Sequence, residues 1–111
     1  LARLPKADDF VLQVRQRVTS ALSGGEPTLE AIASQLAITP RTLQRRLKEH
    51  GTTYQLLLEE LRRELALRYL RDHGLEISEV AFLLGFSEPS AFHRAFRRWT
   101  GTTPLSFRRQ Q

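Results

Sequence analysis

The chain has 111 residues, which suits one compact domain or two very small ones. Its net charge of +5 favours a polyanionic partner, with nucleic acid ahead of an anionic membrane surface. Cysteine is absent, so disulfides and thiolate metal sites are excluded, and no run of about 18 apolar residues would span a membrane. Because the chain begins at Leu1 and contains no Met, we expect it to be a fragment of a longer protein.

Apolar residues along the chain recur at spacings of three and four, which predicts helices throughout and an all-α fold. The first helix has Asp8 or Asp9 as its expected N-cap. It should end at residues 23–25, because glycine adopts the left-handed conformation at a helix end without penalty. Its expected inner face consists of Phe10, Val14, Val18, Ala21 and Leu22.

Two shorter helices follow the first one. Thr28 is the expected N-cap of a helix over about residues 29–36, and Thr39 caps the next helix, over about 40–50. Pro40 stands at the first position of that helix, where a missing N–H costs no hydrogen bond. Two short helices joined by a tight turn are typical of a helix-turn-helix unit.

The longest predicted helix covers about residues 53–73 and has a continuous apolar stripe. Glu59 with Arg63 and Glu64 with Arg68 stand at i,i+4 spacing, so we expect two stabilising ion pairs within this helix. Its acidic and basic residues balance. We therefore interpret it as a neutral spacer between two basic units.

The rest of the chain repeats the arrangement of two short helices, over about 77–84 and 88–99, and Pro104 then begins a last short helix. The predicted organisation is an N-terminal subdomain over residues 1–52, a linker helix over 53–73 and a C-terminal subdomain over 74–111. Units of this size are marginally stable alone, so we expect them to depend on a shared element.

The most informative feature is a pattern that occurs twice, once in each subdomain. Each copy has a small residue where two helices would touch, a turn residue four positions later, and then an apolar residue that fills the gap between the helices. These three positions hold Ala33, Ala37 and Ile38 in the first copy and Ala81, Gly85 and Phe86 in the second. Because an alanine in the left-handed conformation costs about 1 kcal/mol, we expect the first turn to differ in detail from the second.

The second helix of each copy directs polar and basic side chains outward, away from its apolar inner face. The predicted base-reading residues are Arg41, Gln44 and Arg45 in the first copy, and Ser90, His93 and Arg94 in the second. Arginine can bond guanine O6 and N7 with both arms, and glutamine can do the same to adenine N6 and N7. All six residues lie in the first two turns, the part of such a helix that reaches base edges in the major groove.

A further set of residues is predicted to contact DNA phosphates. It consists of Thr28, Thr39, Arg46, Lys48, Ser87, Arg97 and Arg98. The three hydroxyl residues are expected to cap helices whose N-terminal N–H groups face phosphates. For Arg46, an ion pair with Glu49 or Glu30 is an equal alternative. For Arg108, an internal salt bridge is the alternative to a phosphate contact.

Other functions have less support in the sequence. The three histidines share no ligand spacing, so no metal site is predicted, and no nucleophile with a base partner supports catalysis. Trp99 follows two phenylalanines at helical spacing, which favours a core position over base stacking. A protein-interaction module that binds an acidic protein surface is the main alternative, and a helical protein on a membrane surface is a weaker one.

The second copy also carries a specific family pattern. Its residues are Ile77-Ser78-Glu79-Val80-Ala81, Leu84-Gly85-Phe86-Ser87, Ser90, Phe92, Arg94, Phe96, Trp99, Gly101, Thr103-Pro104 and Phe107-Arg108. With these residues the chain resembles, over about residues 10–109, the C-terminal DNA-binding domain of the AraC/XylS transcription regulators. The resemblance implies about seven helices, with two helix-turn-helix subdomains joined by the long central helix.

The resemblance also implies sequence-specific binding of double-stranded DNA, without a cofactor, by two recognition helices in successive major grooves. It implies a cytoplasmic transcription activator that contacts RNA polymerase. The fragment is expected to be monomeric, and the full-length protein to dimerise through an N-terminal domain. Pro89 and Ala91 stand where relatives often have polar readers, so we expect the first subdomain to supply most of the specificity and the second much of the grip.

Overall fold

The computed structural model describes residues 6–111, with side chains from Asp9 onward, and over this range the chain forms seven α-helices, one short 3₁₀ helix and no strand. The helices are α1 (Lys6–Ala21), η1 (Leu22–Gly24), α2 (Leu29–Gln35), α3 (Pro40–Glu49), α4 (Tyr54–Leu70), α5 (Ile77–Leu83), α6 (Pro89–Thr100) and α7 (Pro104–Arg109). The predicted all-α fold is therefore confirmed.

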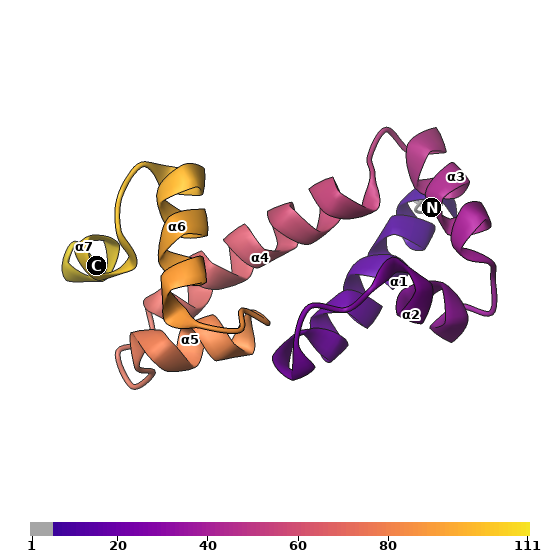
Figure 1. Cartoon of the computed structure of the whole chain (residues 1–111). Helices are drawn as coiled ribbons and strands as arrows, with labels where there is room; N and C mark the ends of the chain where they lie inside the picture. The colour runs from indigo at the N-terminus through magenta and orange to yellow at the C-terminus, as the bar shows by residue number, and fades with distance from the viewer. Residues whose placement is uncertain (1–5) are drawn as a thin grey trace, which may run out of the picture.

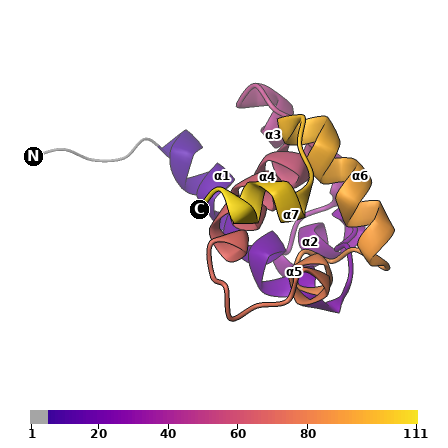
Figure 2. The ribbon, with the colours of Figure 1, turned by 90° about the vertical axis from the view of Figure 1, so that its left-hand side faces the viewer.

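The central helix α4 crosses the molecule, with α1–α3 at one end and α5–α7 at the other (Figure 1). In the turned view, α1 and α6 lie on opposite sides of α4 (Figure 2). The buried leucines of α4 include Leu57, Leu58, Leu61, Leu65 and Leu70. They belong to one hydrophobic cluster that contains residues of both subdomains, from Phe10 to Phe96. The two helix-turn-helix units thus share one core, which is the shared element that units of this size require.

Four helices begin with a threonine cap. The hydroxyl oxygens of Thr28, Thr39, Thr53 and Thr103 accept hydrogen bonds of 3.0–3.1 Å from the backbone N–H groups of Ala31, Thr42, Leu56 and Ser106. Each bond satisfies one of the N–H groups that a helix start leaves free, and contributes about 1 kcal/mol to helix stability. The predicted caps Thr28 and Thr39 are confirmed.

The predicted cap Ser87 was wrong, because Glu88 is the N-cap of α6. Pro89 occupies the first helical position, and a residue that precedes a proline is held in the extended conformation. Glu88 accordingly has φ −156° and ψ 153°, outside the helical region. The chain therefore enters the helix one residue later than the sequence pattern suggests.

Two other predicted helix limits were also wrong. α1 begins at Lys6, so Asp8 and Asp9 lie inside the helix and neither is its N-cap. α4 ends at Leu70 rather than at residue 73.

The segment after α4 is bound to α7 by Arg108. Its guanidinium donates to the carbonyl oxygens of residues 70, 72 and 75 at 2.9, 3.1 and 2.6 Å. Arg108 thus has a structural role that rests on backbone carbonyls rather than on a salt bridge.

The tight turns of the two units have the same conformation. Ala37 has φ 58° and Gly85 has φ 85°, both in the left-handed region. The next N–H groups bond back to the small residue of the first helix, Ile38 N to Ala33 O at 3.0 Å and Phe86 N to Ala81 O at 3.1 Å. The expectation that the first turn differs was therefore wrong. The same closing hydrogen bond fixes both turns, and Ala37 accepts the left-handed conformation at a cost of about 1 kcal/mol.

Candidate nucleic-acid interface

Helix α3 presents a polar and basic outer face. Leu43 and Leu47 are fully buried and fix its inner side against the core. The exposed residues on the remaining surface are Arg41, Gln44, Arg45, Lys48 and Glu49. The two inner leucines stand four residues apart, so the side chains between and around them point away from the core. Three cations and one amide are therefore available on this face to an external partner, with Arg45 3.7 Å from Glu49 in an exposed pair.

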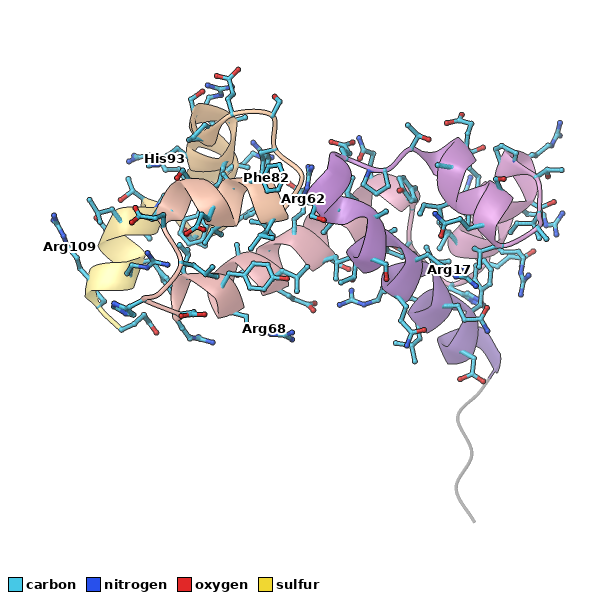
Figure 3. The ribbon with its side chains drawn as sticks, turned by 90° about the horizontal axis from the view of Figure 1, so that it is seen from below. Arg17, Arg62, Arg68, Phe82, His93 and Arg109 are labelled. Carbon is cyan, nitrogen blue, oxygen red and sulfur yellow. The ribbon has the colours of Figure 1, made fainter. Side chains whose placement is uncertain are left out.

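Helix α6 has the same inner and outer faces. Phe92 and Phe96 are fully buried. The exposed residues of its outer face are Ser90, Arg94, Arg97 and Arg98. His93 is half-buried, and its ring makes a T-shaped contact with the Phe92 ring at a centroid distance of 6.4 Å. Figure 3 shows His93 apart from Arg62 and Phe82.

The two outer faces correspond residue by residue once the helix starts are aligned. Each begins with an N-cap and a proline, Thr39-Pro40 in α3 and Glu88-Pro89 in α6. From that start, Arg41, Gln44 and Arg45 occupy the positions of Ser90, His93 and Arg94. Ser87 has no counterpart in the first unit, so the segment between the turn and the recognition helix is one residue longer before α6 than before α3. The predicted base-reading residues thus lie at equivalent positions of two equivalent helices.

Arg46 does not lie on the outer face of α3. Its guanidinium carbon stands 3.9 Å from the centre of the Phe10 ring, and the side chain is half-buried. This cation–π contact joins α3 to α1. Neither of the predicted ion pairs, to Glu49 or to Glu30, is formed among the described residues.

Arg98 and Trp99 both contact Glu59 of α4. The Arg98 guanidinium is 3.3 Å from Oε2 of Glu59, and Trp99 Nε1 donates to the same oxygen at 2.9 Å. Hydrogen bonds from Trp99 and then from Arg98 lower the pKa of Glu59. Trp99 is half-buried and packs against the core, as predicted. Glu59 therefore links α4 to α6 instead of pairing with Arg63.

Glu64, five residues after Glu59 on α4, makes a similar link to another helix. Its Oε1 lies 2.6 Å from the guanidinium of Arg15 on α1. The expected i,i+4 pairs of Glu59 and Glu64 within α4 are thus replaced by ion pairs to other helices. Side chains of this length reach a neighbouring helix as easily as the next turn, and packing decides which partner is nearer. The central helix therefore separates the two subdomains and also binds each of them through an ion pair.

A buried arginine of α4, Arg62, joins the two subdomains. Its side chain is only 9% exposed. Nε donates to the carbonyl oxygen of Leu84 at 2.8 Å, Nη1 lies 3.3 Å from Glu26 Oε1, and the guanidinium carbon lies 4.2 Å from the centre of the Phe86 ring. Burial lowers the pKa of Arg62, and Glu26 opposes that shift. The sequence does contain one indication that Arg62 is buried, because residue 62 stands four positions after Leu58, on the buried face of α4.

The turn of the second unit also packs directly on the first subdomain. A Cβ on Gly85 would come within 2.8 Å of the carbonyl oxygen of Leu22 and 3.2 Å of the carbonyl carbon of Gly25. Arg62 and Phe82 lie beside this junction in Figure 3. The relative position of α3 and α6 therefore depends on contacts made by η1 and Arg62 as well as on the length of α4.

A family profile described as a helix-turn-helix domain matches residues 32–110. The chain belongs to the AraC-type helix-turn-helix family. The ornithine utilization regulator of Pseudomonas aeruginosa is 44% identical over 108 residues, which cover 97% of this chain and 32% of that protein. The chain therefore spans about a third of the length of that relative.

Solved structures of the family have the same fold as this AraC-type chain. A DNA-binding transcriptional dual regulator from Escherichia coli K-12 superposes with a TM-score of 0.85 and 32% identity, covering 99% of this chain and 96% of that one. The DNA-binding domain of AdpA, a global transcriptional factor solved in complex with a target DNA, has a TM-score of 0.77 and 27% identity, with 90% of both chains covered.

Over the described residues, no helix is both long and apolar enough to cross a membrane. Within the same part of the chain, no three His, Asp or Glu side chains are grouped so that they would hold a metal ion.

Proposed function

We propose that this chain is the DNA-binding domain of a transcription regulator and binds double-stranded DNA by inserting α3 and α6 into successive major grooves. The observation that carries the proposal is the correspondence of the two helices. Each starts at an N-cap and a proline, has two fully buried inner residues and carries outward cations. The helices lie at opposite ends of α4 (Figure 1). Two reading helices about one turn of B-DNA apart, ~34 Å, would meet consecutive grooves on one face of the duplex.

In this proposal, each recognition helix has base-reading and phosphate-binding residues. Arg41, Gln44 and Arg45 read bases from α3, and Ser90, His93 and Arg94 take the equivalent positions on α6. The phosphate contacts are Lys48 and Arg97 on the outer faces, Thr28, Thr39 and Ser87 at the starts of helices, and Arg98. Arg46 has the weakest support in this set, because its guanidinium stacks on Phe10.

The junction between the subdomains supports a fixed geometry of binding. Arg62 and the close approach of Gly85 to η1 hold the two recognition helices in one relative position. A duplex whose groove spacing does not match that position must bend, and the cost of the bend depends on its sequence. Part of the specificity is then expected to come from base pairs that the protein does not touch.

The test combines selection with two matched substitutions. Duplexes selected from a random pool by the wild-type chain define the site, and fluorescence anisotropy then measures affinity for each single-base variant of it. Arg45→Ala and Arg94→Ala should each relax preference at one position, and the two positions should lie about 10 base pairs apart. Relaxed positions that fall within one groove would contradict insertion into successive grooves.

A failure to bind duplex DNA would favour the alternative function, a module that binds another protein. If the wild-type chain binds selected and scrambled duplexes no better than a neutral polymer, the basic faces would instead suit an acidic protein surface. Contact with RNA polymerase, activation of transcription, a cytoplasmic location, a monomeric fragment and dimerisation of a longer protein stay predictions from the family resemblance. Catalysis is not proposed, because the relatives are transcription regulators.

A further inference from the structure

We propose that Glu88 is a specificity-determining residue that accepts a hydrogen bond from the N4 amino group of a cytosine in the major groove met by α6. The inference rests on the proposed function and adds a reader that the sequence pattern does not suggest. It also gives α6 a preference for a base that its arginine at position 94 does not select. Four observations at the start of α6 carry it.

The first observation is that Glu88 occupies a cap position without acting as a side-chain cap. At the equivalent position of α3, the Thr39 hydroxyl accepts from the backbone N–H of Thr42 at 3.0 Å. At α6, the corresponding N–H of Ala91 bonds to the main-chain carbonyl of Glu88 at 3.2 Å, and the Glu88 side chain makes no cap hydrogen bond. The carboxylate is therefore not needed to satisfy the start of the helix.

The second observation is that no cation holds this carboxylate. Four ion pairs are formed among the described residues, and none of them includes Glu88. The residue is exposed. A free carboxylate on a surface that meets phosphates is repelled by them, and this repulsion lowers affinity for every DNA sequence. A hydrogen-bond donor on the DNA would offset this repulsion at the sequences that offer one.

The third and fourth observations concern orientation. Pro89 holds the backbone of Glu88 in the extended conformation, with φ −156° and ψ 153°. The Ser90 hydroxyl donates to Glu88 Oε1 at 2.5 Å, which fixes the carboxylate and leaves Oε2 free to accept. Ser90, which the proposed function places among the base-reading residues, thus also positions Glu88. Pro89, which reads no base itself, places the acceptor at the N-terminal end of the recognition helix, the part that reaches base edges.

The chemistry of the base edges then selects cytosine. Guanine offers only acceptors in the major groove, and thymine offers an acceptor and a methyl group, so both disfavour a carboxylate. Adenine has a donor at N6, but its N7 acceptor lies beside it and repels a second acceptor. Cytosine presents the N4 donor with no acceptor beside it on the same base, and acidic side chains accept from it.

The experiment compares the full chain with Glu88→Gln and Glu88→Ala, using selection from a random duplex pool followed by anisotropy. The wild-type protein should prefer cytosine over the other bases at one position by about tenfold. Glu88→Ala should lose this preference, and Glu88→Gln should shift it toward adenine, whose N6 and N7 suit a glutamine. Glu60→Gln, at an exposed position of α4, removes the same charge and should leave the preference unchanged.

A modified duplex makes the test specific to one atom. When the selected cytosine lacks its N4 amino group, wild-type affinity should fall by about tenfold, whereas the affinity of Glu88→Ala should stay the same. If both Glu88 variants change affinity equally for every base at every position, Glu88 affects only the helix start or the net charge, and the inference is wrong while the proposed function stands. If the wild-type chain enriches no duplex at all, the proposed function fails and this inference fails with it.

Discussion

The two helix-turn-helix units have the same backbone conformation in their turns, but different parts of the molecule lie next to those turns. These neighbours explain why the turn residues differ. Both turns are left-handed and both close with the same hydrogen bond. Ala37 is exposed, so its methyl group has space and only the backbone conformation is unfavourable. Gly85 faces the carbonyl oxygen of Leu22, and a Cβ there would stand 2.8 Å away. Glycine in the second turn is therefore required by the contact between subdomains, as well as by the turn itself.

The starts of the recognition helices differ for a comparable reason. Thr39 caps the start of α3 with its side chain, whereas the Glu88 carboxylate makes no cap hydrogen bond and instead accepts from the Ser90 hydroxyl. The first unit has its arginines and glutamine in the reading positions. The second has a carboxylate and a hydroxyl near its N-terminal end, Arg94 at the position equivalent to Arg45, and Arg97 and Arg98 farther along. One frame can thus present two different recognition chemistries, provided that the inner residues keep the packing.

The largest expected effect comes from Gly85→Ala. The substitution combines a left-handed alanine with a Cβ that overlaps the Leu22 carbonyl, so the free energy of unfolding should fall by about 3 kcal/mol. Urea denaturation followed by circular dichroism measures this change. Gly51, also left-handed but without a neighbour near its Cβ position, is the matched control, and Gly51→Ala should cost only about 1 kcal/mol. Equal losses at both glycines would show that the contact with Leu22 has no energetic weight.

Arg62→Ala should have the next largest effect. It leaves the carbonyl of Leu84 without its donor and removes the guanidinium from the Phe86 ring, which we expect to cost about 2 kcal/mol of unfolding free energy, after allowance for the exposure of Glu26. The exposed neighbour Arg63 serves as control, and its alanine variant should change stability by less than about 0.5 kcal/mol.

Arg62→Ala should also alter DNA binding in a way that a simple loss of stability does not explain. With the junction loosened, α3 and α6 are no longer held at one separation. The variant should therefore discriminate less between the selected duplex and duplexes with one base pair inserted or deleted between the two groove sites. Anisotropy titrations well below the unfolding midpoint measure this spacing preference. An unchanged preference in the folded variant would mean that α4 alone sets the separation.

The sequence predicts most of the fold because the fold depends on local signals. Spacings of three and four placed the helices, and Thr28, Thr39 and Pro40 marked their starts. The buried faces of α3 and α6 follow from the same periodicity, so their outward residues could be named in advance. The family pattern in the second unit added the correct overall arrangement.

What the sequence did not predict depends on partners far away in the chain. Arg62 is buried because Glu26 and the Leu84 carbonyl lie next to it in space, and neither is near it in sequence. Glu59 had an arginine at a favourable i,i+4 spacing and still pairs with α6. Tertiary packing decides between such partners, and periodicity holds no information about it. Glu88 was overlooked because the start of α6 was placed at the wrong residue.

Arg45→Ala is expected to reduce affinity for the selected duplex by about 1–3 kcal/mol and to relax preference at one base pair. Arg97→Ala provides the contrast, because its exposed guanidinium on the second helix is assigned to a phosphate. That variant should weaken binding about equally on all duplexes and lower the slope of log affinity against log salt concentration by roughly 1. Arg98 is a less suitable control, since it pairs with Glu59. If both variants changed affinity uniformly, the division between base-reading and phosphate-binding positions would be wrong.

The smallest expected effect, and the only stabilising one, is that of Ala37→Gly. Removing the left-handed alanine raises the free energy of unfolding by about 1 kcal/mol. The greater conformational freedom of glycine in the unfolded chain lowers it again by about half of that amount. The free energy of unfolding should therefore rise by roughly 0.5 kcal/mol, measured by the same urea titration. DNA affinity should stay unchanged, because the turn already has the conformation that glycine adopts at position 85. A destabilised Ala37→Gly variant would mean that the alanine methyl makes a favourable contact that outweighs the backbone cost. The difference between the two turns would then lie in side-chain packing at both of them, and not in the crowding of the second turn alone.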